Sequence, residues 1–217
     1  MSLAWYGKLP ALGDFASRCL SSPALDAIHG WLADGLVGLS DVDKDWQHRF
    51  SAAPRWRFAW PRGTLPDVGP LGGTVCGVLV PSQDCSGRRF PLIALQAVDA
   101  PLSDISMGWL SRLETVLRLA VAETWSIERF ETALELLNRI APLACDPHAR
   151  IHERGAPGHT FWWRERGGAF GWCVHDGLPT GGDFTALFDP DAIFDPSAPL
   201  PRRRAIETPT TVQGNTQ

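Results

Sequence analysis

Hydrophobic residues recur at helical spacing in the first part of the chain. Ser22 followed by Pro23 supplies a polar cap and a proline suited to a first helical turn. Beyond them, leucine and isoleucine return every three or four residues, which predicts a helix with one buried face. That face consists of Leu25, Ile28, Leu32, Leu36 and Leu39.

Strands are expected where apolar residues alternate with polar ones or run together without a helical period. Trp56, Phe58 and Trp60 alternate with smaller or charged residues, the pattern of a half-buried strand whose aromatic side faces inward. Two longer apolar runs are typical of central strands, and two runs around a pair of glycines are typical of a hairpin. The expected strands are 3–6, 56–60, 74–80, 90–98, 159–164 and 169–175.

Two further helices are expected after the last of the long apolar strands. Ser103 or Asp104 can cap the first, which runs to about Thr124. Ser126 can cap the second, which runs to about Ile140. The first carries Leu110, Leu113, Leu117 and Val121 along one face, and both helices are expected to cover the sheet.

In the C-terminal part of the chain the apolar residues follow neither a helical nor a strand period. Between Gly181 and Phe194 large apolar residues must be buried, but repeated Asp-Pro steps forbid a long helix, so an irregular packed segment is expected. From Pro196 onward few large apolar residues remain to offset the entropy of ordering. We therefore expect a single domain over residues 1–195 and a Pro-rich disordered tail over 196–217.

The charge balance of the chain limits the class of partner that it can bind. The 217 residues carry 20 Lys and Arg against 24 Asp and Glu, a formal net charge of -4. Since the only basic run is 202–204, the clustered cations that bind a phosphate backbone are missing, and nucleic acid is not expected as a partner.

The 5 cysteines form no CxxC pair. Without a signal peptide or an apolar run that could span a membrane, we expect a cytoplasmic protein with reduced thiols.

Known catalytic and cofactor motifs are incomplete, so no catalytic residue, cofactor or metal is expected. The glycines at 69–73 precede no lysine of a phosphate-binding loop. Ser82 follows a strand but lacks the GxSxG surroundings of a hydrolase nucleophile. Cys145, His148 and His152 have the spacing of three zinc ligands without a second paired element, which favours a solvated loop.

Two segments combine glycine, proline and charged residues at high density. Residues 5–15 read WYGKLPALGDF, and residues 77–92 read GVLVPSQDCSGRRFPL. They resemble the GKLPxxGDF and GVLxPSxDxxGRxFPL segments of the TagF (ImpM) family, whose WxFA strand is similar to residues 56–59 here. The resemblance extends over about residues 1–98.

That resemblance implies a fold and a function. The implied fold is of the α+β class, with a central, largely antiparallel sheet flanked by helices in a three-layer α/β/α sandwich. The implied function is that of a non-enzymatic accessory protein of the bacterial type VI secretion system. Within the family this role is post-translational negative regulation, exerted by binding the system's forkhead-associated scaffold protein.

The residue types of the two segments predict one stiff loop cluster at an end of the sheet. Glycine permits backbone angles that other residues resist, and proline restricts them. Asp14 and Asp84 can accept hydrogen bonds from loop amides and pair with the neighbouring arginines. Such a cluster is either a partner-binding surface or a structural clamp. The candidate partner-binding residues are Gly7, Lys8, Pro10, Gly13, Asp14, Phe15, Pro81, Ser82, Asp84, Gly87, Arg88 and Arg89.

Two alternatives stay open for the same residues. A hydrolase would need Ser82 and Asp84 to converge with a histidine such as His175 in a pocket. A small-molecule or phosphopeptide-binding module would instead use Lys8 and the two arginines of the second segment as ligands for an anion.

Overall fold

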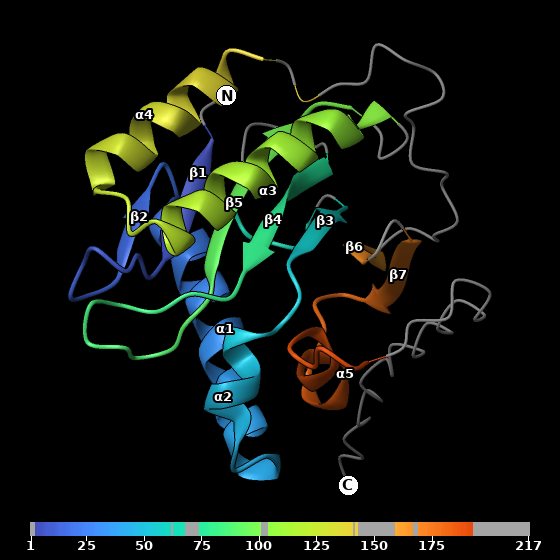
Figure 1. Cartoon of the computed structure of the whole chain (residues 1–217). Helices are drawn as coiled ribbons and strands as arrows, with labels where there is room; N and C mark the ends of the chain where they lie inside the picture. The colour runs from blue at the N-terminus through green and yellow to red at the C-terminus, as the bar shows by residue number, and fades with distance from the viewer. Residues whose placement is uncertain are drawn as a thin grey trace, which may run out of the picture.

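Seven antiparallel strands form one sheet in the computed structural model, which describes residues 3–61, 63–67, 74–100, 104–140, 142, 159–166 and 169–192. The strand order is β2-β1-β5-β4-β3-β6-β7, and five helices accompany the sheet within these residues (Figure 1). The predicted α+β class and the antiparallel sheet are therefore confirmed. The strands are β1 (Ala4–Gly7), β2 (Ala16–Arg18), β3 (Trp56–Trp60), β4 (Thr74–Val80), β5 (Leu92–Val98), β6 (His159–Arg166) and β7 (Ala169–Asp176). The helices are α1 (Ser22–Val42), α2 (Trp46–Ser51), α3 (Met107–Ala122), α4 (Ile127–Asn138) and α5 (Gly181–Leu187).

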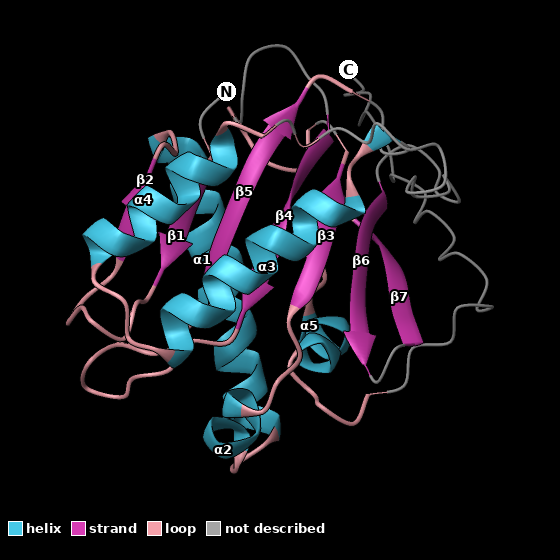
Figure 2. Ribbon diagram, turned by 45° about the horizontal axis from the view of Figure 1, so that its top comes forward, coloured by secondary structure: helices cyan, strands magenta, loops and turns pink. Residues whose placement is uncertain are grey.

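Helices cover both faces of the sheet, which explains why nearly every residue of its central strands β3, β4 and β5 is buried. Helices α3 and α4 lie over one face (Figure 2), and their apolar residues share a hydrophobic core with Trp5 and Val78. On the other face, α1 and α5 pack with Tyr6 and Phe58. Because successive side chains of a strand point to opposite faces, the neighbours Trp5 and Tyr6 of β1 belong to different cores.

Strand β3 is more buried than its alternating pattern predicts. All five of its residues are buried, so the prediction of a half-buried strand was wrong, although its aromatic side does face inward. Arg57 lies on the side that the pattern assigned to solvent. It is 5% exposed, and its Nε donates a hydrogen bond of 2.7 Å to Glu114 of α3. An ion pair with a covering helix replaces water around this charge, which makes its burial tolerable.

The main helices begin at capping serines, though not always at the serines predicted. Ser21, rather than Ser22, caps α1, and its side chain accepts a hydrogen bond from the backbone amide three residues later. Ser106, rather than Asp104, caps α3, so this helix starts later than expected. Ser126 caps α4 as predicted. Neighbouring serines and aspartates have similar capping capacity, so sequence alone does not choose among them.

Two elements differ from the prediction. A helix, α5, replaces the irregular segment expected there, because the first Asp-Pro step, at 189–190, follows its last turn. Phe184 of α5 lies against Gly35 of α1, where any added side chain would overlap its ring. The other element, β2, is a three-residue edge strand that pairs with β1, with Arg18 opposite Trp5. It is too short to show a period in the sequence.

Some expectations concern membranes, metals or residues that the structure does not describe. Within the ranges given above, no helix is long and apolar enough to cross a membrane. In the same ranges no group of three or more His, Cys, Asp or Glu side chains is arranged to hold a metal ion. Outside the described residues lie the predicted tail 196–217, the alternative cap Ser103 and the candidate zinc ligands Cys145, His148 and His152.

Candidate functional site

The two glycine- and proline-rich segments meet at one end of the sheet. Strand β5 runs antiparallel to both β1 and β4, so these two strands are parallel to each other and end on the same side. Gly7, the last residue of β1, and Val80, the last residue of β4, both pair with Leu92. The segments that leave the two strands are therefore brought together, which confirms the predicted loop cluster.

Hydrogen bonds lock the two segments to each other. The Nζ of Lys8 lies 2.8 Å from Oδ2 of Asp84 in an ion pair whose side chains are 6% and 0% exposed. The Ser82 hydroxyl donates a 2.7 Å hydrogen bond to the carbonyl of Lys8. The backbone amide of Cys85 donates to the carbonyl of Leu12 at 2.8 Å. Three contacts of different kinds thus hold the segment after β1 against the segment after β4.

Asp84 is the centre of this cluster. Its Oδ2 accepts hydrogen bonds from Lys8 and from Nε of Arg88, and its Oδ1 accepts from the amides of Ser86 and Arg88. The hydrogen bond from Lys8 is the largest cause that holds the pKa of Asp84 well below its usual range, and the Arg88 and Ser86 donors act in the same direction. Burial opposes them. The carboxylate is therefore a charged anchor within the loop cluster.

The remaining predicted residues contribute unequally. Arg88 also reaches the first segment, where its Nη2 donates to the carbonyl of Gly13 at 2.6 Å. Asp14 accepts a hydrogen bond only from the adjacent Phe15 amide among the described contacts, so it does not pair with an arginine as predicted. Arg89 joins the cluster through its backbone, in a bridge to Gln83. Asp84, rather than Asp14, is thus the residue that the arginine binds.

Glycine is required by backbone geometry at two of the three predicted positions. Gly7 has a φ of 135° and Gly87 a φ of 79°, angles that residues with a side chain rarely adopt. Gly13 has no such angle, so the expectation for this residue was wrong. The prolines lie where expected: Pro10 is buried at the turn after β1, and Pro81 is half-buried directly after β4.

An exposed aromatic residue lies on top of the cluster. Phe15 is 41% exposed, and its ring contacts those of Tyr6, His29 and Phe90, with centroid distances of 5.8, 5.6 and 4.7 Å. The Nζ of Lys8 lies 4.9 Å from the centroid of the Phe15 ring. We call Phe15, Tyr6, His29 and Phe90 the Phe15 patch. It combines an apolar ring with a firm support, as in the anchors of protein interfaces.

His29 is the member of this patch that the sequence did not reveal. It belongs to α1, and nothing in its surroundings distinguishes it from other polar residues on that helix. Its Nδ1 shares a hydrogen bond with the hydroxyl of Tyr6. Burial, with a smaller contribution from the charge of Asp14, raises the pKa of Tyr6 to about 12, so the phenol stays protonated and available for that bond.

The comparison with family models decides the family. The model described as "TagF N-terminal domain, Type VI secretion system-associated" matches residues 4–137, more than half of the chain. This chain belongs to the TagF family. The match includes both motif segments and ends at the last turn of α4, so it covers the whole loop cluster and the Phe15 patch.

A solved structure is similar to this chain over most of its length. The crystal structure of PA0076 from Pseudomonas aeruginosa PAO1 is similar to this TagF chain, with a TM-score of 0.70 and 26% sequence identity. The similarity covers 91% of this chain and 99% of that one. A comparison with curated proteins found no match.

The TagF cluster does not have the geometry that the hydrolase alternative requires. Ser82 is 4% exposed, and its hydroxyl proton is directed to a backbone carbonyl instead of a general base. His175 lies on β7, three strands from β4 in the sheet, or about 14 Å at ordinary strand spacing. There its Nδ1 lies 3.3 Å from Asp183 and its Nε2 lies 3.3 Å from the Cys173 thiol. The residues that a hydrolase would combine are therefore held apart.

The anion-binding alternative meets an electrostatic obstacle. Lys8 and Arg88 both have their charges directed at Asp84. An incoming phosphate would have to compete with that buried carboxylate for both cations. The geometry thus favours a structural use of Lys8 and Arg88, whereas the buried Nε of Arg89, the third residue of this alternative, has no hydrogen-bond partner among the described residues. The Phe15 patch remains available to a partner.

Proposed function

We propose that this TagF chain is a cytoplasmic, non-enzymatic accessory protein of the type VI secretion system that acts by binding another protein. The proposed partner is the system's forkhead-associated scaffold protein, and the proposed effect is post-translational negative regulation of secretion. The family match supports the association with the secretion system. The mode of action rests on the geometry of the loop cluster.

The observation that carries this proposal is the exposed ring of Phe15 above a rigid base. A flexible loop loses conformational entropy when a partner orders it, whereas a loop already held by ion pairs and hydrogen bonds loses little. Here Lys8, Asp84 and Arg88 hold the two segments before any partner arrives. An aromatic side chain on such a base is a favourable anchor for a protein interface.

The chemistry of the cluster also favours binding over turnover. The Ser82 hydroxyl, the Asp84 carboxylate and the cations of Lys8 and Arg88 are each engaged with another group of the cluster. A catalytic group must instead be directed at a substrate. We therefore assign the predicted residues to the support and the surface of an interface.

Binding of the purified full chain to the scaffold protein of the same secretion system tests the proposal. Phe15→Ala should weaken the affinity by about tenfold or more, as expected when an aromatic anchor is lost. Val42→Ala is the matched control, because Val42 is a 74% exposed apolar residue about 20 Å further along α1 than His29. Equal affinities of wild type and the Phe15 variant would exclude the patch as the interface.

A separate measurement in cells tests whether the protein lowers secretion. Deletion of the gene should raise secretion, and wild type should restore the original level. Phe15→Ala should fail to restore it at equal protein abundance, while Val42→Ala should succeed. Unchanged or lower secretion after deletion would contradict negative regulation, whatever the binding result.

A further inference from the structure

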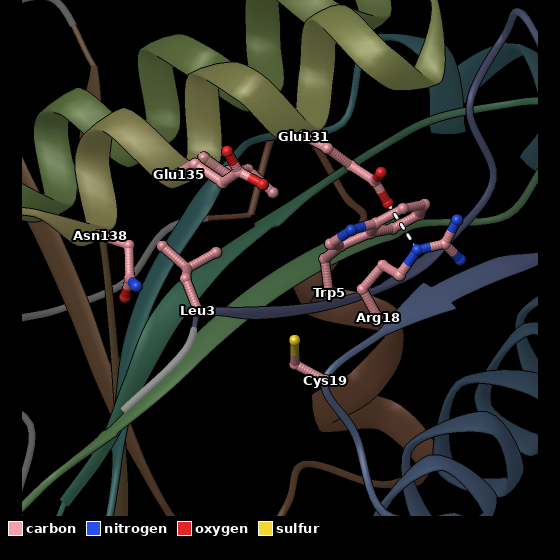
Figure 3. A pocket seen from close by; sticks show the side chains of 8 residues that line it. Leu3, Trp5, Arg18, Cys19, Glu131, Glu135 and Asn138 are labelled. Carbon is pink, nitrogen blue, oxygen red and sulfur yellow. Dashed lines mark ion pairs between the residues drawn. The ribbon is translucent and has the colours of Figure 1, made fainter.

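A second feature lies on the other side of β1, between α4 and the sheet edge formed by β1 and β2. Here the structure holds a pocket of about 300 Å³ (Figure 3). One wall comes from α4, where Glu131, Glu135 and Asn138 follow each other at spacings of four and three residues and so share a helix face. The opposite wall comes from the strands, where Trp5 and Arg18 are register partners.

Three polar atoms of residues that line this pocket lack the hydrogen bonds that buried polar groups normally make, and one of them, Oε1 of Glu131, is the atom that forms an ion pair with Arg18. Trp5 is 1% exposed, and its indole Nε1 is buried without a hydrogen-bond partner. The side-chain oxygen Oδ1 of Asn138 is likewise buried and without a partner. An unpaired donor and an unpaired acceptor therefore lie on residues of one pocket, where a ligand would supply the hydrogen bonds that these atoms lack.

The charged side chains of the pocket are distributed over its two walls in the same way as the unpaired donor and acceptor. Arg18 has its Nε 2.8 Å from Glu131 and donates from Nη1 to the carbonyl of Ser17, which leaves Nη2 for another acceptor. Glu135 makes no ion pair with any of the described residues. The α4 wall therefore offers acceptors and negative charge, and the strand wall offers donors and positive charge.

We propose that this pocket binds a small zwitterion of the α-amino-acid class. The ammonium group would lie against Glu135 and Asn138, and the carboxylate would accept hydrogen bonds from Trp5 Nε1 and Arg18. Leu3 also lines the pocket and gives an aliphatic side chain an apolar contact. A volume of about 300 Å³ is at the small end of ligand pockets, as suits a ligand of this size.

This site is independent of the proposed partner interface. Trp5 belongs to the core beneath α4, whereas Tyr6 of the Phe15 patch belongs to the core beneath α1. The two features lie on opposite faces of the same strand because consecutive side chains alternate. Failure of one proposal therefore leaves the other standing.

The indole N–H resonance of Trp5 tests the proposal directly. Full-length protein labelled with ¹⁵N-tryptophan is titrated with L-leucine and then with the other natural amino acids, and Trp5→Phe assigns the signal. At least one amino acid should shift the Trp5 resonance saturably and leave most other indole resonances in place. For L-leucine, the matched probes are N-acetyl-L-leucine, which lacks the ammonium group, and 3-methylbutylamine, which lacks the carboxylate. Each should bind at least about tenfold more weakly, as should L-leucine to Glu135→Gln.

A second readout covers the case in which Trp5→Phe does not fold. Cys19 lines the same pocket, while Cys85 is exposed in the loop cluster and serves as an internal reference. The bound amino acid should slow alkylation of Cys19 and leave that of Cys85 unchanged, as measured by peptide mass spectrometry. The proposal is overturned if no amino acid up to about 10 mM shifts an indole resonance or protects Cys19. It is also overturned if the zwitterion and its two singly charged analogues act alike.

Discussion

Lys8 and Asp84 lie 76 positions apart in the chain, yet their side chains form a buried ion pair with a distance of 2.8 Å between Nζ and Oδ2. The pair closes the end of the sheet by joining the segment after β1 to the segment after β4. Arg88 adds a second cation to the same carboxylate and a hydrogen bond to Gly13. Asp84 therefore binds both cations that link the two segments of the proposed interface.

Removal of the buried cation should destabilise the fold. Lys8→Met leaves Asp84 without its main partner, and a buried charge that loses its partner is costly. We expect the midpoint of thermal unfolding to fall by several degrees. Arg88→Met is the matched control, because its side chain is 62% exposed and solvent can replace part of the lost interaction, so its effect should be smaller. Equal midpoints for Lys8→Met and wild type would show that the pair contributes nothing to stability.

Stability should fall in acid through Asp84. Its pKa is lower in the folded protein than the value of about 3.9 in an unfolded chain, so the folded state keeps the negative charge to lower pH. The resulting stabilisation is fully present above about pH 4 and is lost as the pH falls through the folded pKa. Urea unfolding of wild type and Asp84→Asn over a pH series measures this. The advantage of wild type should shrink below about pH 4, and a constant difference would contradict the assignment.

Two glycines of the first segment should respond differently to alanine. At Gly7, which has a φ of 135°, an added Cβ would overlap the carbonyl oxygen of Pro91, so Gly7→Ala should lower stability strongly and disrupt the loop cluster. At Gly13 the nearest atom to an added Cβ is the Cys85 sulfur at 3.6 Å, an ordinary contact. Gly13→Ala should therefore change the unfolding free energy by less than about 1 kcal/mol. Thermal or urea unfolding of the two variants distinguishes them, and a similar loss for both would argue against this geometry.

The ion pair beneath α3 should matter more than its exposed neighbour. Glu114→Gln removes the charge that faces Arg57, whose side chain is 6% exposed, and should cost about 2 kcal/mol of unfolding free energy. Arg55 reaches the same glutamate, but its side chain is 45% exposed, so Arg55→Gln should cost no more than about 1 kcal/mol. Urea unfolding at neutral pH measures both. A larger loss for the Arg55 variant would reverse this ranking.

Local sequence patterns were sufficient for most of the regular elements. The apolar run 74–80 coincides with β4, and the predicted apolar face of α1 lies in the core apart from Leu25, which is partly buried. These patterns are informative because a strand or helix that packs one face against the core must repeat its apolar residues at the period of that element. The edge strand β2 and the helix α5 are short, so neither repeats long enough to be recognised.

The sequence by itself determined the residue types of the site: the glycines, prolines and charges of two segments that had to form stiff loops. Only the tertiary structure decided how they combine. Gly7 and Val80 both pair with Leu92, and this strand order places Lys8 beside Asp84 and leaves Asp14 outside the pair. The same packing brings His29 of α1 under Phe15. Local backbone preferences act over a few residues, whereas these contacts join segments whose proximity exists only after the sheet has formed.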